Sequence, residues 1–118
     1  MFYLVEACWI ARNIDGVEVE FLGRPAGTFK SLAILALSTG TPVVPAYCWR
    51  EPGGRHVLRF EEPLTPVECE DPGDAIRQNT RAYNVALERM LLRHPEQWIW
   101  MHRRWKQGAY ARRAAAKE

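Results

Sequence analysis

The sequence predicts an α/β fold in which helices cover a small mixed sheet. Short apolar or alternating runs typical of strands occur before and after helical patterns, in the order strand, strand, helix, strand, strand, helix, helix. Glycines and prolines that favour turns separate these runs. A chain of 118 residues with 47% hydrophobic and 25% charged side chains has the size and composition of one small globular domain.

The N-terminal part is expected to hold two strands and a helix. Residues 2–9 are apolar and β-prone, and residues 17–22 alternate apolar side chains with glutamates, as in a strand with one buried and one solvated face. A loop rich in glycine and proline follows, and Thr28 is predicted to end it as the N-cap of a helix over 29–39. Gly40 is the residue expected just after that helix.

The second half is expected to hold a hairpin and two helices. Residues 42–47 form an apolar run consistent with a central strand, but Pro42 and Pro45 each remove a ladder donor, so this strand must meet an edge or a bulge there. The turn at 52–54 leads into a strand over 55–61. Apolar side chains recur at helical spacing over 75–93, which predicts an amphipathic helix. A second short helix is predicted over 96–106, with three large side chains on one face: Trp98, Met101 and Trp105.

The charge of the chain is distributed unevenly. Residues 102–118 hold six basic and one acidic side chain, whereas residues 1–101 hold 10 basic and 13 acidic ones. A positively charged end suits an anionic partner such as a phospholipid surface, a phosphorylated glycolipid or nucleic acid, and it is equally typical of a solvated tail. We expect no nucleic-acid partner, because most of the chain is acidic and the tryptophans fall on a predicted helix.

No group of side chains predicts a bound metal or a cofactor. The three cysteines include no CxxC pair, so they indicate neither a zinc site nor a disulfide framework. His56 and Glu61 have the HxxxxE spacing at which glycerolipid acyltransferases carry a catalytic base and its acidic partner. We interpret this match as accidental, because residues five apart on a strand point to opposite faces.

Two segments carry cations in settings that suit binding. Arg24 lies in a stiff loop before the predicted helix start, where it and the free N–H groups around Thr28 would suit an anion. The alternative is a structural turn with Arg24 in an ion pair. The second segment combines aromatic and basic side chains, which suits a lipid headgroup interface, or else a packed core with a solvated basic face. Its members are Trp98, Trp100, Arg103, Arg104, Trp105 and Lys106.

These residues give the sequence a family resemblance. It resembles the bacterial lipid A biosynthesis acyltransferases, the lauroyl and myristoyl transferase family. The last of the matching blocks is long and chemically unusual, so it is the most specific. The blocks are 16–28 (GVEVEFLGRPAGT), 35–46 (LALSTGTPVVPA) with the hairpin 52–55 (PGGR), and 93–106 (RHPEQWIWMHRRWK). We therefore expect residues 1–106 to be the C-terminal part of a glycerolipid-acyltransferase-like fold and residues 107–118 to be a basic tail.

The resemblance implies an activity and its partners. A fatty acyl chain would move from acyl carrier protein to a hydroxyl of a lipid A precursor, at the cytoplasmic face of the bacterial inner membrane. The family's acidic strand end corresponds here to Glu6 in the run VEAC. Among the residues of this chain, the resemblance leaves four as expected substrate contacts: Arg24, Thr28, Arg103 and Arg104.

The same resemblance implies that the catalytic residues belong to a segment that this chain lacks. The family's catalytic His-x-x-x-x-Asp/Glu lies upstream of the GRP block, and no histidine precedes Gly23 in this chain. We therefore expect a C-terminal fragment that is inactive alone. The alternative is a remnant without catalytic activity that binds anionic lipid.

Overall fold

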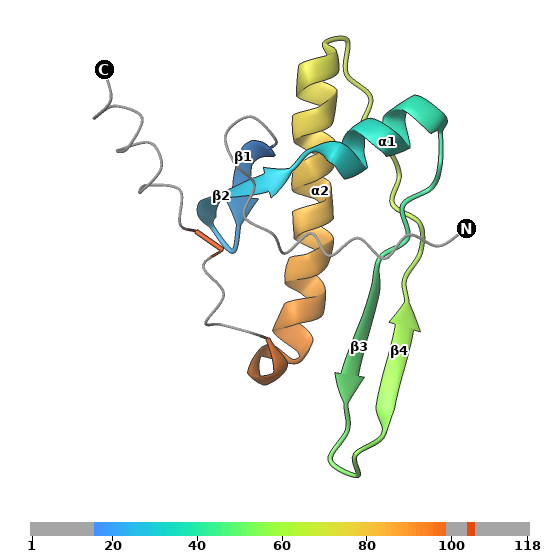
Figure 1. Cartoon of the computed structure of the whole chain (residues 1–118), viewed down its shortest axis with the longest axis vertical. Helices are drawn as coiled ribbons and strands as arrows, with labels where there is room; N and C mark the ends of the chain where they lie inside the picture. The colour runs from blue at the N-terminus through green and yellow to red at the C-terminus, as the bar shows by residue number, and fades with distance from the viewer. Residues whose placement is uncertain (1–15, 99–103, 106–118) are drawn as a thin grey trace.

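The computed structural model describes residues 16–98 and 104–105, and the predicted α/β class is confirmed. The described strands pair as two antiparallel two-stranded sheets, β1–β2 and β3–β4 (Figure 1). The strand expected over 2–9 lies outside the described residues. The elements are β1 (Gly16–Phe21), β2 (Arg24–Phe29), α1 (Ser31–Thr39), β3 (Ala46–Arg50), β4 (His56–Phe60), α2 (Pro72–Arg93) and the 3-10 turn η1 (Pro95–Gln97).

The first hairpin confirms one predicted strand and adds another. β1 buries Val19 and Phe21 and exposes the glutamates between them, as its alternating pattern predicts. The prediction of a loop that ends with Thr28 as a helix N-cap was wrong, because Arg24–Phe29 forms β2 and pairs in register with β1. Pro25 fits this strand because it lies on an outer edge, where its missing N–H costs no ladder hydrogen bond.

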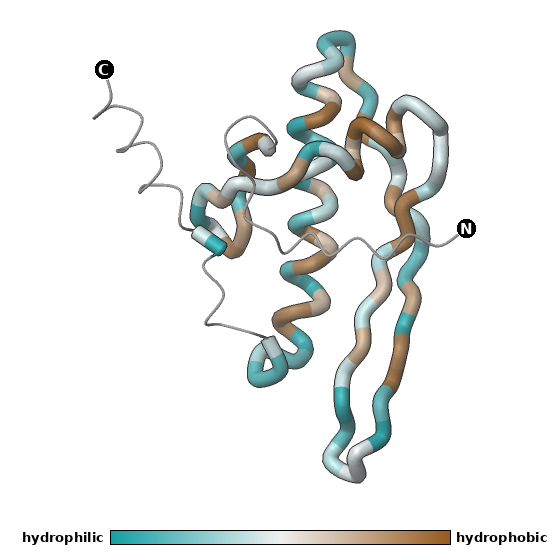
Figure 2. The backbone as a smooth tube through the Cα atoms, viewed as in Figure 1, coloured by the Kyte–Doolittle hydropathy of each residue, from teal (hydrophilic) through white to brown (hydrophobic). Residues whose placement is uncertain are grey.

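Helix α1 begins later than predicted and ends where predicted. Its N-cap is Lys30, which makes no side-chain capping bond, and Gly40 ends it with a left-handed φ of 69°. α1 is hydrophobic through its middle turns (Figure 2). Only Ala33 is buried, however, while Ile34 and Leu35 are each 42% exposed.

The second hairpin, β3–β4, contacts the C-terminal end of α2, and its turn projects beyond that end (Figure 1). The turn at residues 52–54 is confirmed, but β3 begins at Ala46, later than predicted. Val43 makes only an isolated bridge to Leu64, because the prolines on either side of it cannot donate to a ladder. In the described residues β3 pairs with β4 alone, so the central position predicted for it is not met there.

Helix α2 is the longest element and contacts β1, α1 and η1. It begins one turn before the predicted 75–93, where the Asp71 side chain accepts a hydrogen bond from the Asp74 N–H at 2.9 Å and Pro72 takes the first position. The helix predicted over 96–106 was wrong at its start. Residues 95–97 form a 3-10 turn and Trp98 is extended, which lets its ring reach the core beside Phe21.

The main core lies between the first hairpin and α2. Phe21, Ala26 and Leu91 are buried there, and four half-buried side chains pack around them: Leu22, Leu87, Trp98 and Trp105. No helix within residues 16–98 and 104–105 is long and apolar enough to cross a bilayer.

Candidate functional site at the first hairpin

One face of α2 binds the backbone of β1 with polar side chains. In a two-stranded antiparallel sheet, alternate residues of each strand turn their N–H and C=O groups away from the partner strand. On β1 these outward groups belong to Glu18 and Glu20, and α2 binds both of their carbonyl oxygens as well as the N–H of Leu22 in the turn that follows. Arg77 Nη1 donates to Glu18 O at 3.1 Å, Arg81 Nη1 donates to Glu20 O at 3.1 Å, and Glu88 Oε1 accepts from the Leu22 N–H at 2.8 Å.

The rise per residue of a helix and of a strand explains how side chains of α2 can bind successive outward groups of β1. Four residues of helix advance about 6 Å, and two residues of strand advance about 6.8 Å. Arg77 and Arg81, four apart on α2, can therefore reach Glu18 and Glu20, two apart on β1. Glu88 lies seven residues after Arg81 and binds the turn instead of the strand, so it fixes where the tip of the hairpin lies.

The hairpin tip is a two-residue turn with an unusual residue in it. Leu22 and Gly23 both have positive φ, 51° and 74°, which is typical of a type I′ turn. Glycine and asparagine adopt this conformation readily, whereas leucine rarely does. Leu22 is held there by the bond from its N–H to Glu88 and by packing against the core. The turn places Arg24 directly opposite Phe21.

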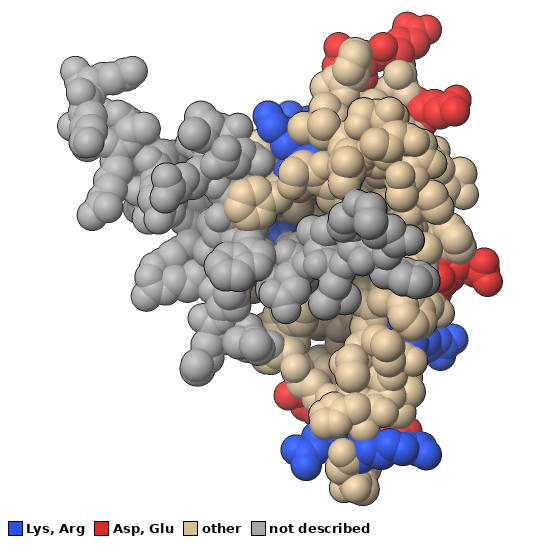
Figure 3. Space-filling model, turned by 45° about the vertical axis from the view of Figure 1, so that its right-hand side comes forward, with Lys and Arg blue, Asp and Glu red and all other residues tan. Residues whose placement is uncertain are grey.

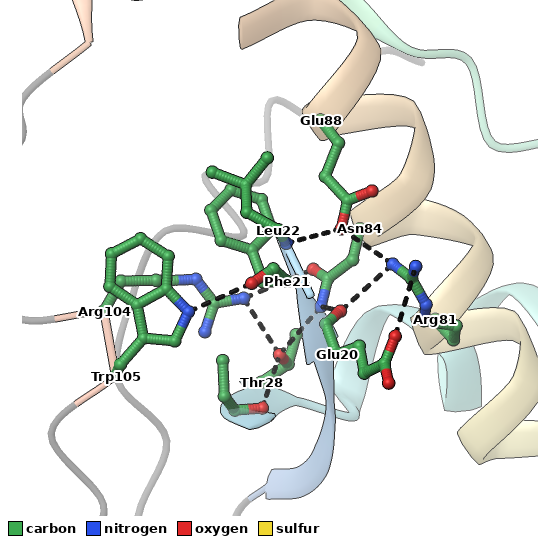
Figure 4. A network of polar contacts seen from close by, with 10 residues as sticks. Glu20, Phe21, Leu22, Thr28, Arg81, Asn84, Glu88, Arg104 and Trp105 are labelled. Carbon is green, nitrogen blue, oxygen red and sulfur yellow. Dashed lines mark hydrogen bonds and ion pairs between the residues drawn. The ribbon is translucent and has the colours of Figure 1, made fainter. Parts of the chain in front are cut away.

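Arg104 binds the opposite edge of the same hairpin from the C-terminal part of the chain. Its side chain is 1% exposed, and Nη1 donates to Gly27 O at 2.7 Å. Nη2 donates to Thr28 Oγ1 at 2.9 Å and to Asn84 Oδ1 at 3.2 Å (Figure 4). The guanidinium also lies over the Phe21 ring, 4.9 Å from its centroid. Arg104 therefore joins β2, α2 and the core.

Asn84 is the centre of this polar network. Its side chain is fully buried, and its amide nitrogen donates to Glu20 O at 3.0 Å and to Thr28 Oγ1 at 3.3 Å. Its amide oxygen accepts from Arg104. A buried polar side chain is stable only when its hydrogen bonds are made, so Asn84 requires the hairpin and Arg104 in this arrangement.

Trp105 brings an aromatic ring to Arg24. Its indole N–H donates to Phe21 O at 3.0 Å, and its ring lies 5.8 Å from the Phe21 ring. The Arg24 Cζ lies over the indole at 5.6 Å from the ring centroid, within the range of a cation–π interaction. Among the described residues, no carboxylate forms an ion pair with Arg24, which remains exposed to solvent.

Three of the four expected contact residues therefore meet at one hairpin. Arg24, Thr28 and Arg104 lie together, and Arg103 lies outside the described residues. Thr28 is 2% exposed and Arg104 is 1% exposed, so both side chains are engaged inside the protein. Arg24 is exposed, and the alternative of a structural ion pair for it finds no partner within residues 16–98 and 104–105. Trp98 and Trp105 pack on the core.

The HxxxxE match does not form a pair. His56 is exposed and pairs with Arg50 at the turn end of the hairpin, whereas Glu61 follows the other end of β4. The Glu61 carboxylate lies 3.5 Å from Arg89 and 3.4 Å from Arg93. Interpreting the match as accidental was therefore correct. The ion pairs instead tie the second hairpin to the end of α2.

Further contacts strengthen that connection. Arg93 donates to the Tyr47 hydroxyl. Trp49 stacks on His94 with ring centroids 5.1 Å apart. Gln97 exchanges two hydrogen bonds, each 2.8 Å, with the backbone of Arg50. These interactions fix the second hairpin to the C-terminal end of α2.

Few other described side chains stand out by their charge or by a shifted pKa. Acidic side chains gather where α2 begins, and arginines crowd the tip of the second hairpin (Figure 3). Burial raises the pKa of the Tyr83 phenol above its usual 10.0. Within the described parts of the chain, no three histidine, cysteine or acidic side chains are grouped so as to hold a metal ion.

Comparison with known proteins decides the family. The model of the bacterial lipid A biosynthesis acyltransferase family matches residues 3–107. The chain belongs to this family. Over 86 residues it is 30% identical to the lipid A biosynthesis lauroyltransferase of Escherichia coli (strain K12), covering 73% of this chain and 27% of that protein. The chain thus spans about a quarter of the length of this lipid A acyltransferase. The first and last matching blocks meet in the structure, because Arg104 donates to Gly27 O and the Trp105 ring lies against Arg24.

Proposed function

We propose that this chain is the C-terminal part of an acyltransferase that moves a fatty acyl chain from acyl carrier protein to a hydroxyl of a lipid A precursor. Membership of the lipid A acyltransferase family supports this activity. The 30% identity to a lipid A lauroyltransferase supports a fatty acyl donor and a glycolipid acceptor. The proposed place of action is the cytoplasmic face of the inner membrane, where the fragment would bind peripherally.

In this proposal the catalytic residues lie outside the part of the chain that the structure describes. General base catalysis needs a histidine whose partner orients it and whose nitrogen reaches the acceptor hydroxyl. His56 and Glu61 lie apart, and the exposed pair of His94 with Glu96 spans 3.6 Å at the end of α2. We assign the catalytic His-x-x-x-x-Asp/Glu to a segment upstream of the GRP block.

The observation that supports a substrate-binding role for this part is the placement of Arg24. It is an exposed cation on a turn that α2, Trp105 and the core hold in place. A guanidinium is well suited to a phosphate, because its planar N–H groups can donate two parallel hydrogen bonds. We assign Arg24 to an anionic group of the glycolipid or of the carrier's phosphopantetheine arm, and Arg103 to the same surface. Thr28 and Arg104 would act by holding the hairpin.

The DNA upstream of Met1 tests the assignment of the chain. We expect an in-frame extension that encodes His-x-x-x-x-Asp/Glu, and the product of the whole frame should transfer acyl groups from acyl carrier protein to a lipid A precursor. In that enzyme Arg24→Gln should reduce turnover. Arg59→Gln removes an equally exposed arginine on β4 and serves as the matched control.

The 118-residue chain provides a second test. We expect it to bind vesicles that contain the bisphosphorylated lipid A precursor, to lose this binding with added salt, and to transfer no acyl groups. Acyl transfer by this chain alone would refute the proposal that it lacks the catalytic segment. A stop codon upstream with no such motif would favour the remnant that binds anionic lipid without catalysis.

A further inference from the structure

We infer that Trp105 and Arg104 are positioning residues that hold the Arg24 guanidinium for a phosphate group. This inference rests on the proposed function, since it takes Arg24 as the contact for the anion. It gives residues of the last matching block, 93–106, a positioning role that the basic charge and the tryptophans of this block do not by themselves predict. Arg104 and Trp105 act on the substrate through the hairpin and not by direct contact.

The first step of the argument is the position of Trp105. Its indole N–H donates to Phe21 O, and Phe21 lies opposite Arg24 in the hairpin register. The indole is thus bonded to the residue that faces Arg24 across the turn. From there its ring lies beneath the Arg24 Cζ at 5.6 Å. An indole face attracts a guanidinium and narrows the range of its orientations.

The second step is the anchor of Trp105 itself. The preceding residue, Arg104, donates to Gly27 O, Thr28 Oγ1 and Asn84 Oδ1, all of them buried. Hydrogen bonds from a charged donor are stronger than those from a neutral one. Residue 104 is therefore anchored against β2, and the indole that follows it is held by its own hydrogen bond to Phe21 O.

The third step is the rigidity of the turn that carries Arg24. Leu22 has a φ of 51°, a conformation that costs a leucine free energy and that the surroundings must maintain. The bond from its N–H to Glu88 Oε1 and its packing in the core supply this restraint. Arg24 is thus restrained from both sides, by α2 through Leu22 and by the last block through Trp105.

A nuclear magnetic resonance measurement on the 118-residue chain tests the geometry without any ligand. An indole ring shifts the resonances of protons that lie over it. We expect the δ and ε protons of Arg24 to be shifted upfield in the wild type and to return toward ordinary values in Trp105→Leu. Arg104→Lys should reduce the shift in part. Arg24 resonances that are unchanged by Trp105→Leu would overturn the inference.

Binding measurements test the function of this arrangement. The probe is a neutral phosphatidylcholine vesicle containing a small fraction of bisphosphorylated lipid A precursor, compared with the same glycolipid after dephosphorylation. We expect Trp105→Leu to weaken binding about two- to fivefold, the equivalent of an exposed cation–π interaction. Free phosphopantetheine is the second probe, and it identifies whether the phosphate belongs to the lipid or to the carrier arm.

A double-mutant cycle separates positioning from general stability. If Trp105 acts through Arg24, Trp105→Leu should have no effect on binding in the Arg24→Gln background. Equal losses in both backgrounds would refute positioning while leaving Arg24 as a contact. Wild-type binding by Arg24→Gln would instead refute the proposed site. If Trp105→Leu does not fold, Trp105→Phe keeps an aromatic ring while it removes the N–H donor and shrinks the face on which Arg24 lies, and its loss of binding should likewise disappear in the Arg24→Gln background.

Discussion

Replacing Asn84 by leucine should destabilise the chain and disconnect the first hairpin from α2. Asn84 is fully buried and makes three hydrogen bonds, two donated and one accepted. Leucine has the same branching and is somewhat larger, so the substitution removes the polar contacts and leaves no cavity. The change in stability therefore combines the lost hydrogen bonds with the fit of the larger side chain.

The size of the effect follows from those bonds. Each contributes about 0.5–1.5 kcal/mol net, and a buried group left without a partner costs about 1–3 kcal/mol. Glu20 O keeps its bond from Arg81, and Thr28 Oγ1 keeps its bond from Arg104. Only the Arg104 guanidinium loses an acceptor outright. We expect Asn84→Leu to lower the free energy of unfolding by about 2–4 kcal/mol, a large share of the stability of a small domain.

Asn79 on the same helix is the matched control for Asn84. It is 2% exposed and also makes three hydrogen bonds, to the backbone of Val67 and Ala75. Urea denaturation of both leucine variants should give losses of similar size. Only Asn84→Leu should also weaken binding to vesicles that contain the phosphorylated glycolipid. Unchanged stability in Asn84→Leu, or equal losses of binding in both variants, would refute the role given to the network.

Three further predictions concern the turn, a helix end and a buried phenol. Glu88→Ala removes the acceptor of the Leu22 N–H and should lower the free energy of unfolding by about 1–3 kcal/mol. Glu88→Gln keeps an oxygen at this position and should lower the free energy of unfolding by less. Equal losses of stability in urea denaturation of the two variants would count against the hydrogen bond. Gly40→Ala should cost about 1 kcal/mol because of the left-handed φ, and Gly53→Ala, which has open space and no positive φ, should change the melting temperature little. Because the folded-state pKa of Tyr83 is raised, its contribution to stability is full below pH 10.0 and is lost as the pH rises through that raised pKa. The wild type should therefore lose more stability than Tyr83→Phe in alkaline denaturation, and parallel curves would refute this.

The sequence predicted those elements whose signals are local. Helix α2 has a long apolar repeat, an aspartate cap and a proline at each end, so its limits were found to within one turn. The turn at residues 52–54 and the glycine at the end of α1 were also found, because glycine there has a single structural explanation. Strand β2 was missed because its glycines and proline favour a loop, and only pairing with β1 makes Arg24–Phe29 extended.

The polar network could not be predicted from composition or periodicity. Arginine and asparagine on an amphipathic helix are normally assigned to the solvated face. One signal was present: the polar residues of α2 that bind the hairpin recur at the spacing expected of an apolar stripe. They are Arg77, Arg81, Asn84 and Glu88. The burial of Arg104 had no such signal, since it depends on oxygens that lie 20 to 77 residues away in the sequence.

The bonds that hold the first hairpin have a consequence for how the chain is made. Hydrogen-bond partners of the hairpin are separated from it by 56 to 84 residues in the sequence and lie between Arg77 and Trp105. A ribosome therefore releases residues 16–29 long before α2 and the last block exist, and contacts so distant in sequence form late in folding. Until then Leu22 has nothing to hold it in a left-handed turn, so the nascent hairpin should be open. Its closure requires that residues 88 and 104–105 have emerged, so a product cut short inside α2 would lack the hairpin conformation on which the proposed anion site depends.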